Sequence, residues 1–138
     1  MKEVVSISLG RSARDYEFTT TLLGQEVRVR RIGANGDVPR VKALIREYDG
    51  QVDAIGLGGV VPKFQVGRSV YVHEGATEIA RLGQQWPAAD GALLKATLER
   101  WAVAEAVSKE AGRCNYRRIL VFAGIERYPL AEALSGYN

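Results

Sequence analysis

Residues 3–9 alternate apolar and polar side chains and are followed by a glycine and a short polar run. A period of two is typical of a β-strand, and the glycine indicates a loop after it. Residues 18–23 and 26–32 are two further β-prone runs around Gly24-Gln25. They predict an antiparallel hairpin whose two-residue turn begins with glycine.

The apolar spacing then changes to three and four residues, which is the period of a helix. Asp37 is placed to cap the start of this helix, and Gly50 is placed to end it. Residues 52–57 follow as an apolar strand. The apolar stripe of the helix consists of Val41, Leu44, Ile45 and Tyr48.

The second half of the chain begins with residues 63–66 and 69–72, which predict a second hairpin across Gly67-Arg68. Residues 74–82 predict a short helix. Residues 91–111 predict the longest helix. The apolar face of that longest helix is predicted to contain Leu94, Leu98, Trp101 and Ala102.

The end of the chain predicts one more strand and one more helix. Residues 118–123, RILVFA, are apolar on both faces, as a central strand covered by helices should be. Residues 129–134 predict a short helix stopped by Gly136. A terminal βα unit is typical either of the first half of a longer protein or of a domain closed by its last helix.

The alternation of short apolar strands and helices predicts the α/β class. We expect a single layered domain over residues 1–138, with a mixed sheet that has a parallel centre, hairpin additions and flanking helices.

Composition narrows the function classes. One cysteine (Cys114) and one histidine (His73) predict no metal centre and fit a cytoplasmic protein. The 19 basic and 16 acidic residues are spread along the chain without a basic stripe interleaved with aromatic residues, so nucleic acid is not an expected partner. The N-terminus is too polar and short for a membrane span.

Glycines that end predicted strands are the first candidate ligand contacts. Gly56, Gly58 and Gly59 follow an apolar strand, and the loop after the first strand contains Gly10, Arg11 and Ser12. A backbone without Cβ atoms approaches a ligand closely, although a tight turn needs the same residue type. The loop after Gly59 leads toward a hairpin, so it lacks the helix that a dinucleotide fingerprint requires.

Charged residues at other strand-to-loop transitions complete the candidate site. Asp90 and Lys95 are either an acid/base pair or a helix cap with a nearby lysine. Glu126 and Arg127 follow the predicted strand 118–123 and either face a ligand or form a solvated turn. We expect all of these residues to line one crevice.

Three segments, VDAIGLGG, DGALLKATLERW and AGIERYPLAEAL, resemble the N-terminal half of bacterial proteins named quinate 5-dehydrogenase. The resemblance implies an NAD(P)-linked oxidation of a cyclic polyhydroxy acid, and hence NAD(P) as cofactor. It also implies that a C-terminal half follows this chain.

Two functions are therefore expected. The first is a small-molecule-binding, oxidoreductase-related α/β domain. The alternative is a non-catalytic assembly domain of a larger protein, which associates with itself or with its missing half. The candidate contacts for assembly are Phe64, Tyr71, Trp86 and Trp101.

Overall fold

The computed structural model describes residues 1–82, 85, 87–110, 112 and 118–137. Its contacts divide the chain into two compact units. Unit 1 is Met1–Pro62 with Val72–Asp90, and unit 2 is Lys63–Tyr71 with Gly91–Asn138. The five-stranded sheet lies in unit 1. The count of one domain over the whole chain stays a prediction.

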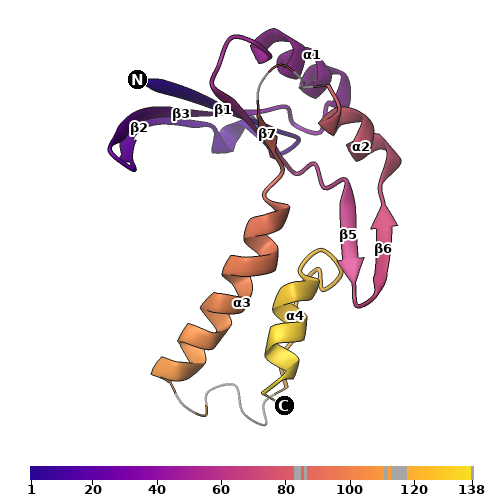
Figure 1. Ribbon diagram of the computed structural model, residues 1–138. Helices are drawn as coiled ribbons and strands as arrows, with labels where there is room; N and C mark the ends of the chain where they lie inside the picture. Colours follow the sequence, from indigo (N-terminus) through magenta and orange to yellow (C-terminus); the bar gives the residue numbers. More distant parts are fainter. Residues whose placement is uncertain (83–84, 86, 111, 113–117, 138) are drawn as a thin grey trace. The chain divides into compact units, whose positions relative to one another are not determined.

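Unit 1 is built on a five-stranded sheet in the order β2-β3-β1-β4-β7 (Figure 1). Strands β3, β1, β4 and β7 run parallel, while β2 pairs with β3 in the antiparallel sense. The predicted α/β class and the mixed sheet with a parallel centre are therefore confirmed. The strands are β1 (Lys2–Ser8), β2 (Tyr16–Leu22), β3 (Gln25–Gly33), β4 (Ala54–Gly58) and β7 (Ala88–Ala89).

The turn between β2 and β3 differs from its prediction by one residue. Leu22 pairs with Gln25, so the turn residues are Leu23 and Gly24 and not Gly24-Gln25. Both have positive φ, 51° and 78°, as a type I′ turn requires. The prediction failed because it placed glycine first in the turn, whereas this turn type uses glycine second.

Two helices pack on this sheet, and their starts are set by side chains. Helix α1 (Val38–Tyr48) begins where the carboxylate of Asp37 accepts a hydrogen bond from the backbone N–H of Arg40. Helix α2 (Glu74–Ala80) begins where Nδ1 of His73 accepts one from the N–H of Ala76 at 3.1 Å. The predicted cap at Asp37 and the predicted apolar stripe of α1 are confirmed.

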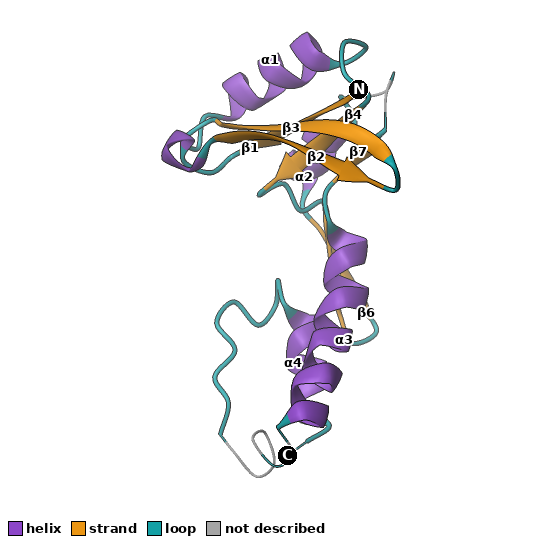
Figure 2. Cartoon of the chain, turned by 90° about the vertical axis from the view of Figure 1, so that its left-hand side faces the viewer, coloured by secondary structure: helices purple, strands orange, loops and turns teal. Residues whose placement is uncertain are grey.

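The core of unit 1 lies between the sheet and these helices. Side chains alternate along a strand, so the buried residues of β1 and β4 share one sheet face. Helices α1 and α2 contribute to the same buried cluster, and Figure 2 shows α1 lying over the sheet. An ion pair of 2.6 Å between Lys42 and Glu78 links the two helices. The largest fully buried side chains are Val5, Ile7, Val41, Ile45, Ile55 and Val60.

Unit 2 contains two helices and the hairpin of β5 (Lys63–Val66) and β6 (Ser69–Val72), except for Val72, which belongs to unit 1. The helices are α3 (Ala92–Lys109) and α4 (Tyr128–Ser135), which lie side by side in Figures 1 and 2. The hairpin and both helices are confirmed. The long helix ends at Lys109 with Glu110 as its C-cap, two residues before the predicted end at Ala111.

The predicted central strand over residues 118–123 is wrong. The structure has no strand there, and Leu120 and Phe122 are 86% and 88% exposed. Ala123 has a φ of 57°, which is outside the β region. An apolar composition favours a strand, but a strand also needs a neighbour for its backbone groups. In the described part of the chain none pairs with this segment.

Candidate functional site

Three parallel strands end side by side at the carboxyl edge of the unit 1 sheet. Ser8, the last residue of β1, is in register with Gly33 of β3 and with Gly58 of β4. The loops that follow are joined by backbone hydrogen bonds. The N–H of Leu9 donates to the carbonyl of Gly58 at 2.9 Å, and the N–H of Asn35 donates to that of Gly10 at 2.9 Å. The carboxyl edge therefore gathers three loops into one surface.

The chain leaves this edge in two directions. From β1 it turns through the short helix η1 (Ser12–Arg14) and β2 to reach β3 on one side. From β3 it passes through α1 to β4 on the other side of β1. Open α/β sheets bind ligands at such reversals of strand order, outside the carboxyl ends of the strands.

Asn35 fixes the loop after β1. Its side-chain oxygen accepts a hydrogen bond from the backbone N–H of Ser12 at 2.8 Å, and its amide donates to Oγ of Ser12 at 3.0 Å. Asn35 and Gly36 have positive φ values of 54° and 85°, which form a tight turn before α1. In the described part of the chain, the exposed guanidinium groups of Arg11 and Arg14 have no ion-pair partner.

Arg31 closes the inner side of the carboxyl edge. Its side chain is only 13% exposed and donates to Oγ of Ser8 at 2.9 Å and to Asp15 at 2.7 Å. The same carboxylate oxygen of Asp15 accepts the N–H of Gly33 at 2.6 Å. Arg31 therefore holds the loops together, and its charge is balanced by Asp15 within the fold. Arg11 and Arg14 are exposed cations beside it.

Three of the four glycines predicted to contact a ligand are favoured at this edge by close packing or by a positive φ. A Cβ on Gly58 would lie 2.7 Å from Oγ of Ser8, and one on Gly10 would lie 2.8 Å from a guanidinium nitrogen of Arg31. Gly59 has a φ of 69°, whereas a Cβ on Gly56 would meet Ser6 at an ordinary 3.4 Å. Ligand contact at Gly10, Gly56, Gly58 and Gly59 stays a prediction.

Sequence reasoning missed several residues that order this edge. The signal for Asn35 is the Asn-Gly pair directly before a helix cap, which is a strong turn signal. Arg31 carries no comparable signal, because an arginine on an alternating strand is usually solvated. The missed residues are Ser8, Asp15, Arg31, Gly33 and Asn35.

Asp90 and Lys95 belong to different units, Asp90 to unit 1 and Lys95 to unit 2. The alternative that Asp90 caps the long helix is wrong, because the N-cap is Gly91 with a φ of 76°. Glycine takes this position because its left-handed backbone conformation costs little. A pairing of Asp90 with Lys95, and the single crevice for all predicted residues, stay predictions.

Lys95 and Glu126 form an ion pair within unit 2. Nζ of Lys95 lies 2.7 Å from Oε1 of Glu126, and this hydrogen bond holds the pKa of Glu126 below its usual value. A lowered pKa keeps the carboxylate ionised, which is the opposite of what a general acid at neutral pH needs. The pair therefore ties α3 to the segment before α4.

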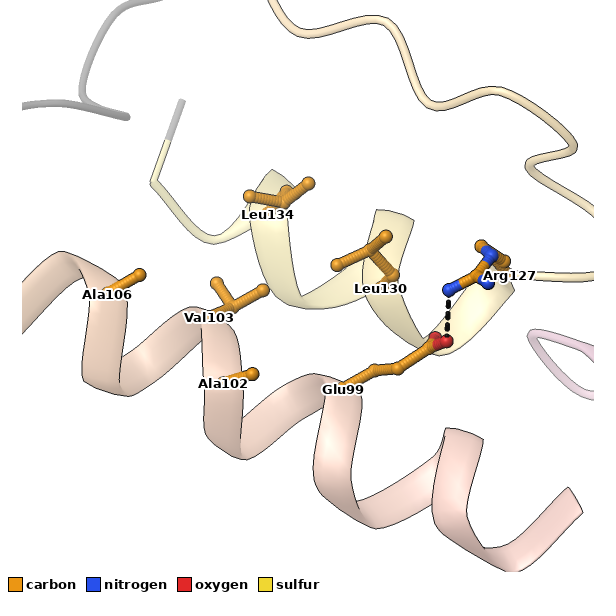
Figure 3. Close-up of a pocket in the computed structure, with 7 residues that line it drawn as sticks. All are labelled: Glu99, Ala102, Val103, Ala106, Arg127, Leu130 and Leu134. Atoms are coloured by element: carbon orange, nitrogen blue, oxygen red, sulfur yellow. Dashed lines mark hydrogen bonds and ion pairs between the residues drawn. The ribbon is translucent and has the colours of Figure 1, made fainter. Parts of the chain in front are cut away.

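Two further ion pairs and a cavity lie between α3 and α4. Arg127 donates from Nη1 to Oε1 of Glu99 at 2.6 Å, and Arg100 pairs with Glu132. Beside them is a cavity of about 260 Å³ (Figure 3). Of its lining residues, only Arg127 is among the residues predicted from the sequence. The lining residues are Glu99, Ala102, Val103, Ala106, Arg127, Leu130 and Leu134.

Of the four aromatic residues predicted to mediate assembly, Tyr71 and Trp101 are exposed and Phe64 is half-buried. Trp86 and Cys114 lie outside the described residues. Within the described residues, none of the helices combines the length and the apolar character needed to cross a membrane.

Unit 1 is an α/β sheet in which the loops after β1, β3 and β4 meet at the carboxyl edge. The chain belongs to the family described as Domain of unknown function (DUF8753), whose model matches residues 3–90. A second model, Domain of unknown function (DUF8754), matches residues 93–138. The first matched range ends at residue 90 and the second begins at residue 93, next to the division between unit 1 and the helices of unit 2 after Asp90. No curated protein and no solved structure matches the chain.

Proposed function

We propose that the chain binds a small hydroxylated carboxylate at the carboxyl edge of the unit 1 sheet. The observation that carries this proposal is the ordered loop that presents Arg11 and Ser12 beside the ends of three parallel strands. Arg11 and Arg14 supply unpaired positive charge, and guanidinium groups suit the geometry of a carboxylate. Ser12 and Asn35 supply polar groups for hydroxyls.

The oxidoreductase activity implied by the resemblance to quinate 5-dehydrogenases has less support. A pyrophosphate usually sits on the N-terminus of a helix that follows a parallel strand. At the start of α1 the carboxylate of Asp37 already occupies that position. We therefore propose binding without assigning a reaction or NAD(P). A cytoplasmic location is part of this proposal.

Calorimetric titration with quinate tests the binding site. We expect the double variant Arg11→Gln/Arg14→Gln to bind quinate about tenfold more weakly than the wild type, because each exposed charge contributes up to about 1 kcal/mol. Arg68→Gln is the matched control, since Arg68 is exposed on the turn of the unit 2 hairpin. Equal affinity of all three proteins, or no binding of quinate, shikimate or phosphate at millimolar concentration, contradicts the proposal.

A second candidate function, self-association, is favoured by the surface of α3. Val103 is buried on the side that faces α4, but four large apolar residues of α3 remain 50% to 78% exposed. A helix that is apolar on opposite sides is normally covered on both. Of the predicted apolar face of this helix, Ala102 lines the space beside α4, whereas Leu94, Leu98 and Trp101 are exposed. The exposed residues are Leu93, Leu94, Leu98 and Trp101.

Light scattering tests the second candidate, with a second copy of the chain as the partner. Pairing of α3 with its symmetry mate predicts twice the mass of one chain in the wild type, because an isologous contact uses the same residues on both copies. Leu98→Glu should restore the monomer mass, whereas Leu23→Glu, at a fully exposed turn, should not. A wild type that stays monomeric at high concentration removes this candidate.

A further inference from the structure

The cavity between α3 and α4 has an apolar body and one polar end. Five of its seven lining residues carry only carbon side chains, and these side chains extend from both helices toward the space between them (Figure 3). The polar end is formed by Glu99 and Arg127. The carbon-lined walls consist of Ala102, Val103, Ala106, Leu130 and Leu134.

Glu99 has one carboxylate oxygen that the fold leaves unsatisfied. Oε1 accepts the hydrogen bond from Arg127 at 2.6 Å, but Oε2 is buried and has no hydrogen-bond partner among the described residues. The side chain as a whole is only 16% exposed. A buried acceptor without a donor is costly, typically about 1 to 3 kcal/mol, and it therefore points to a missing hydrogen-bond donor.

The charges at the polar end select the kind of donor. A ligand carboxylate has no proton to donate to Oε2 and would be repelled by the carboxylate of Glu99, whereas an ammonium would be repelled by the guanidinium of Arg127. A neutral hydroxyl avoids both, because it donates to Oε2 and offers its own lone pairs to the guanidinium. The space is a groove open to solvent, since Ala102 and Ala106 in its wall are exposed. Its volume of about 260 Å³ has room for a six-membered ring and a short substituent.

We propose that this cavity binds a small neutral alcohol or phenol with an apolar body, whose hydroxyl hydrogen bonds to Oε2 of Glu99. The site uses residues of α3 and α4 and the N-cap residue of α4, Arg127, and none of the residues of the carboxyl edge in unit 1. It is therefore independent of the proposed quinate site, and either proposal can fail alone.

Three probes with one apolar body and different heads test the ligand class. They are cyclohexylmethanol, cyclohexylmethylammonium and cyclohexanecarboxylate, each titrated into the isotopically labelled full chain and followed through amide NMR shifts. We expect the alcohol to shift the amides of residues around the cavity with a dissociation constant on the order of 1 mM. The carboxylate should bind about tenfold more weakly because of its repulsion by Glu99.

Two substitutions locate the binding. Ala106→Leu fills the cavity with a residue of similar helix propensity and should abolish alcohol binding. Ala104→Leu is the matched control, because Ala104 is an exposed residue of α3 that does not line the cavity. Glu99→Gln removes the charge and should reduce the preference for the alcohol over the carboxylate to about threefold or less.

Binding of the alcohol that is lost in Ala106→Leu, kept in Ala104→Leu and less selective in Glu99→Gln supports the site. Absence of shifts with all three probes, equal affinity for the three heads, or tighter binding of the ammonium overturns the proposal. Loss of binding in the Ala104→Leu control also overturns it, because the shifts would then come from another surface.

Discussion

Gly33→Ala is expected to destabilise unit 1 by about 2 to 3 kcal/mol, which is at the upper end for overpacking a tight site. A Cβ at this position would lie 2.6 Å from the backbone carbon and oxygen of Arg11 and 2.7 Å from the N–H nitrogen of Ser12. These are main-chain atoms, so no side-chain rotation relieves the clash. The loop after β1 must move, and the hydrogen bond of the Gly33 N–H to Asp15 must stretch or break.

Urea denaturation followed by circular dichroism measures this effect, with Gly56→Ala as the matched control. Gly56 is also a strand glycine of the same sheet, but a Cβ there would meet Ser6 at only 3.4 Å. The control should be neutral or slightly stabilising, because alanine loses less backbone entropy than glycine on folding. Equal stability of the two variants would contradict the close approach of the loop to β3.

The same variant connects the fold to the proposed quinate site. Displacement of Arg11 and Ser12 should weaken quinate binding in any Gly33→Ala protein that remains folded, whereas Gly56→Ala should retain the wild-type affinity. A folded Gly33→Ala protein with unchanged quinate affinity would place the ligand elsewhere than at the loop after β1.

Local patterns in the sequence predicted most of unit 1. The helix capped by Asp37 shows a period of 3.6 and both boundary signals, and each local signal agrees with the tertiary contacts. The strands β1, β3 and β4 were predictable because their apolar residues alternate or run continuously between turn residues, whereas β7, with two residues, is too short to show a pattern. The turn at Leu23 and Gly24 was predicted one residue late, because two-residue turns with glycine first and glycine second share one composition.

Unit 2 was less predictable because its elements depend on what covers them. Residues 118–123 have the composition of a central strand, yet a strand forms only beside another strand that satisfies its backbone. Similarly, α3 is apolar on opposite sides, so periodicity alone could not tell which side faces α4. The sequence indicated Leu94, Leu98, Trp101 and Ala102, but of these Ala102 lines the space beside α4, together with Glu99 and Val103.

Only part of the candidate site could be predicted, because its order depends on contacts between residues that are distant along the chain. Strand-to-loop transitions are local features, so the loops at Gly10 and Gly58 were found from the sequence. The partners of their residues are distant along the chain, as in the contact of Ser12 with Asn35 and of Arg31 with Ser8. One sequence without tertiary contacts cannot reveal such pairs.

Ile55→Ala is expected to have the largest effect of any single substitution considered, a loss of about 3 to 4 kcal/mol. Ile55 lies in β4 between β1 and β7, is 1% exposed, and belongs to the cluster that joins the sheet to α1 and α2. Truncation removes three carbon atoms from the centre of this cluster. The strands on both sides are hydrogen-bonded to β4, so they cannot move in to close the cavity.

The control is Leu22→Ala on the edge strand β2, where the side chain is 61% exposed. Its effect should stay within about 0.5 kcal/mol, because a solvated side chain loses little packing. Both variants are compared by urea denaturation at a common slope, since a changed slope would indicate a changed unfolded state. If Ile55→Ala costs no more than Leu22→Ala, the cluster between the sheet and its two helices does not stabilise unit 1. The carboxyl edge would then lack the rigid support that its proposed binding role requires.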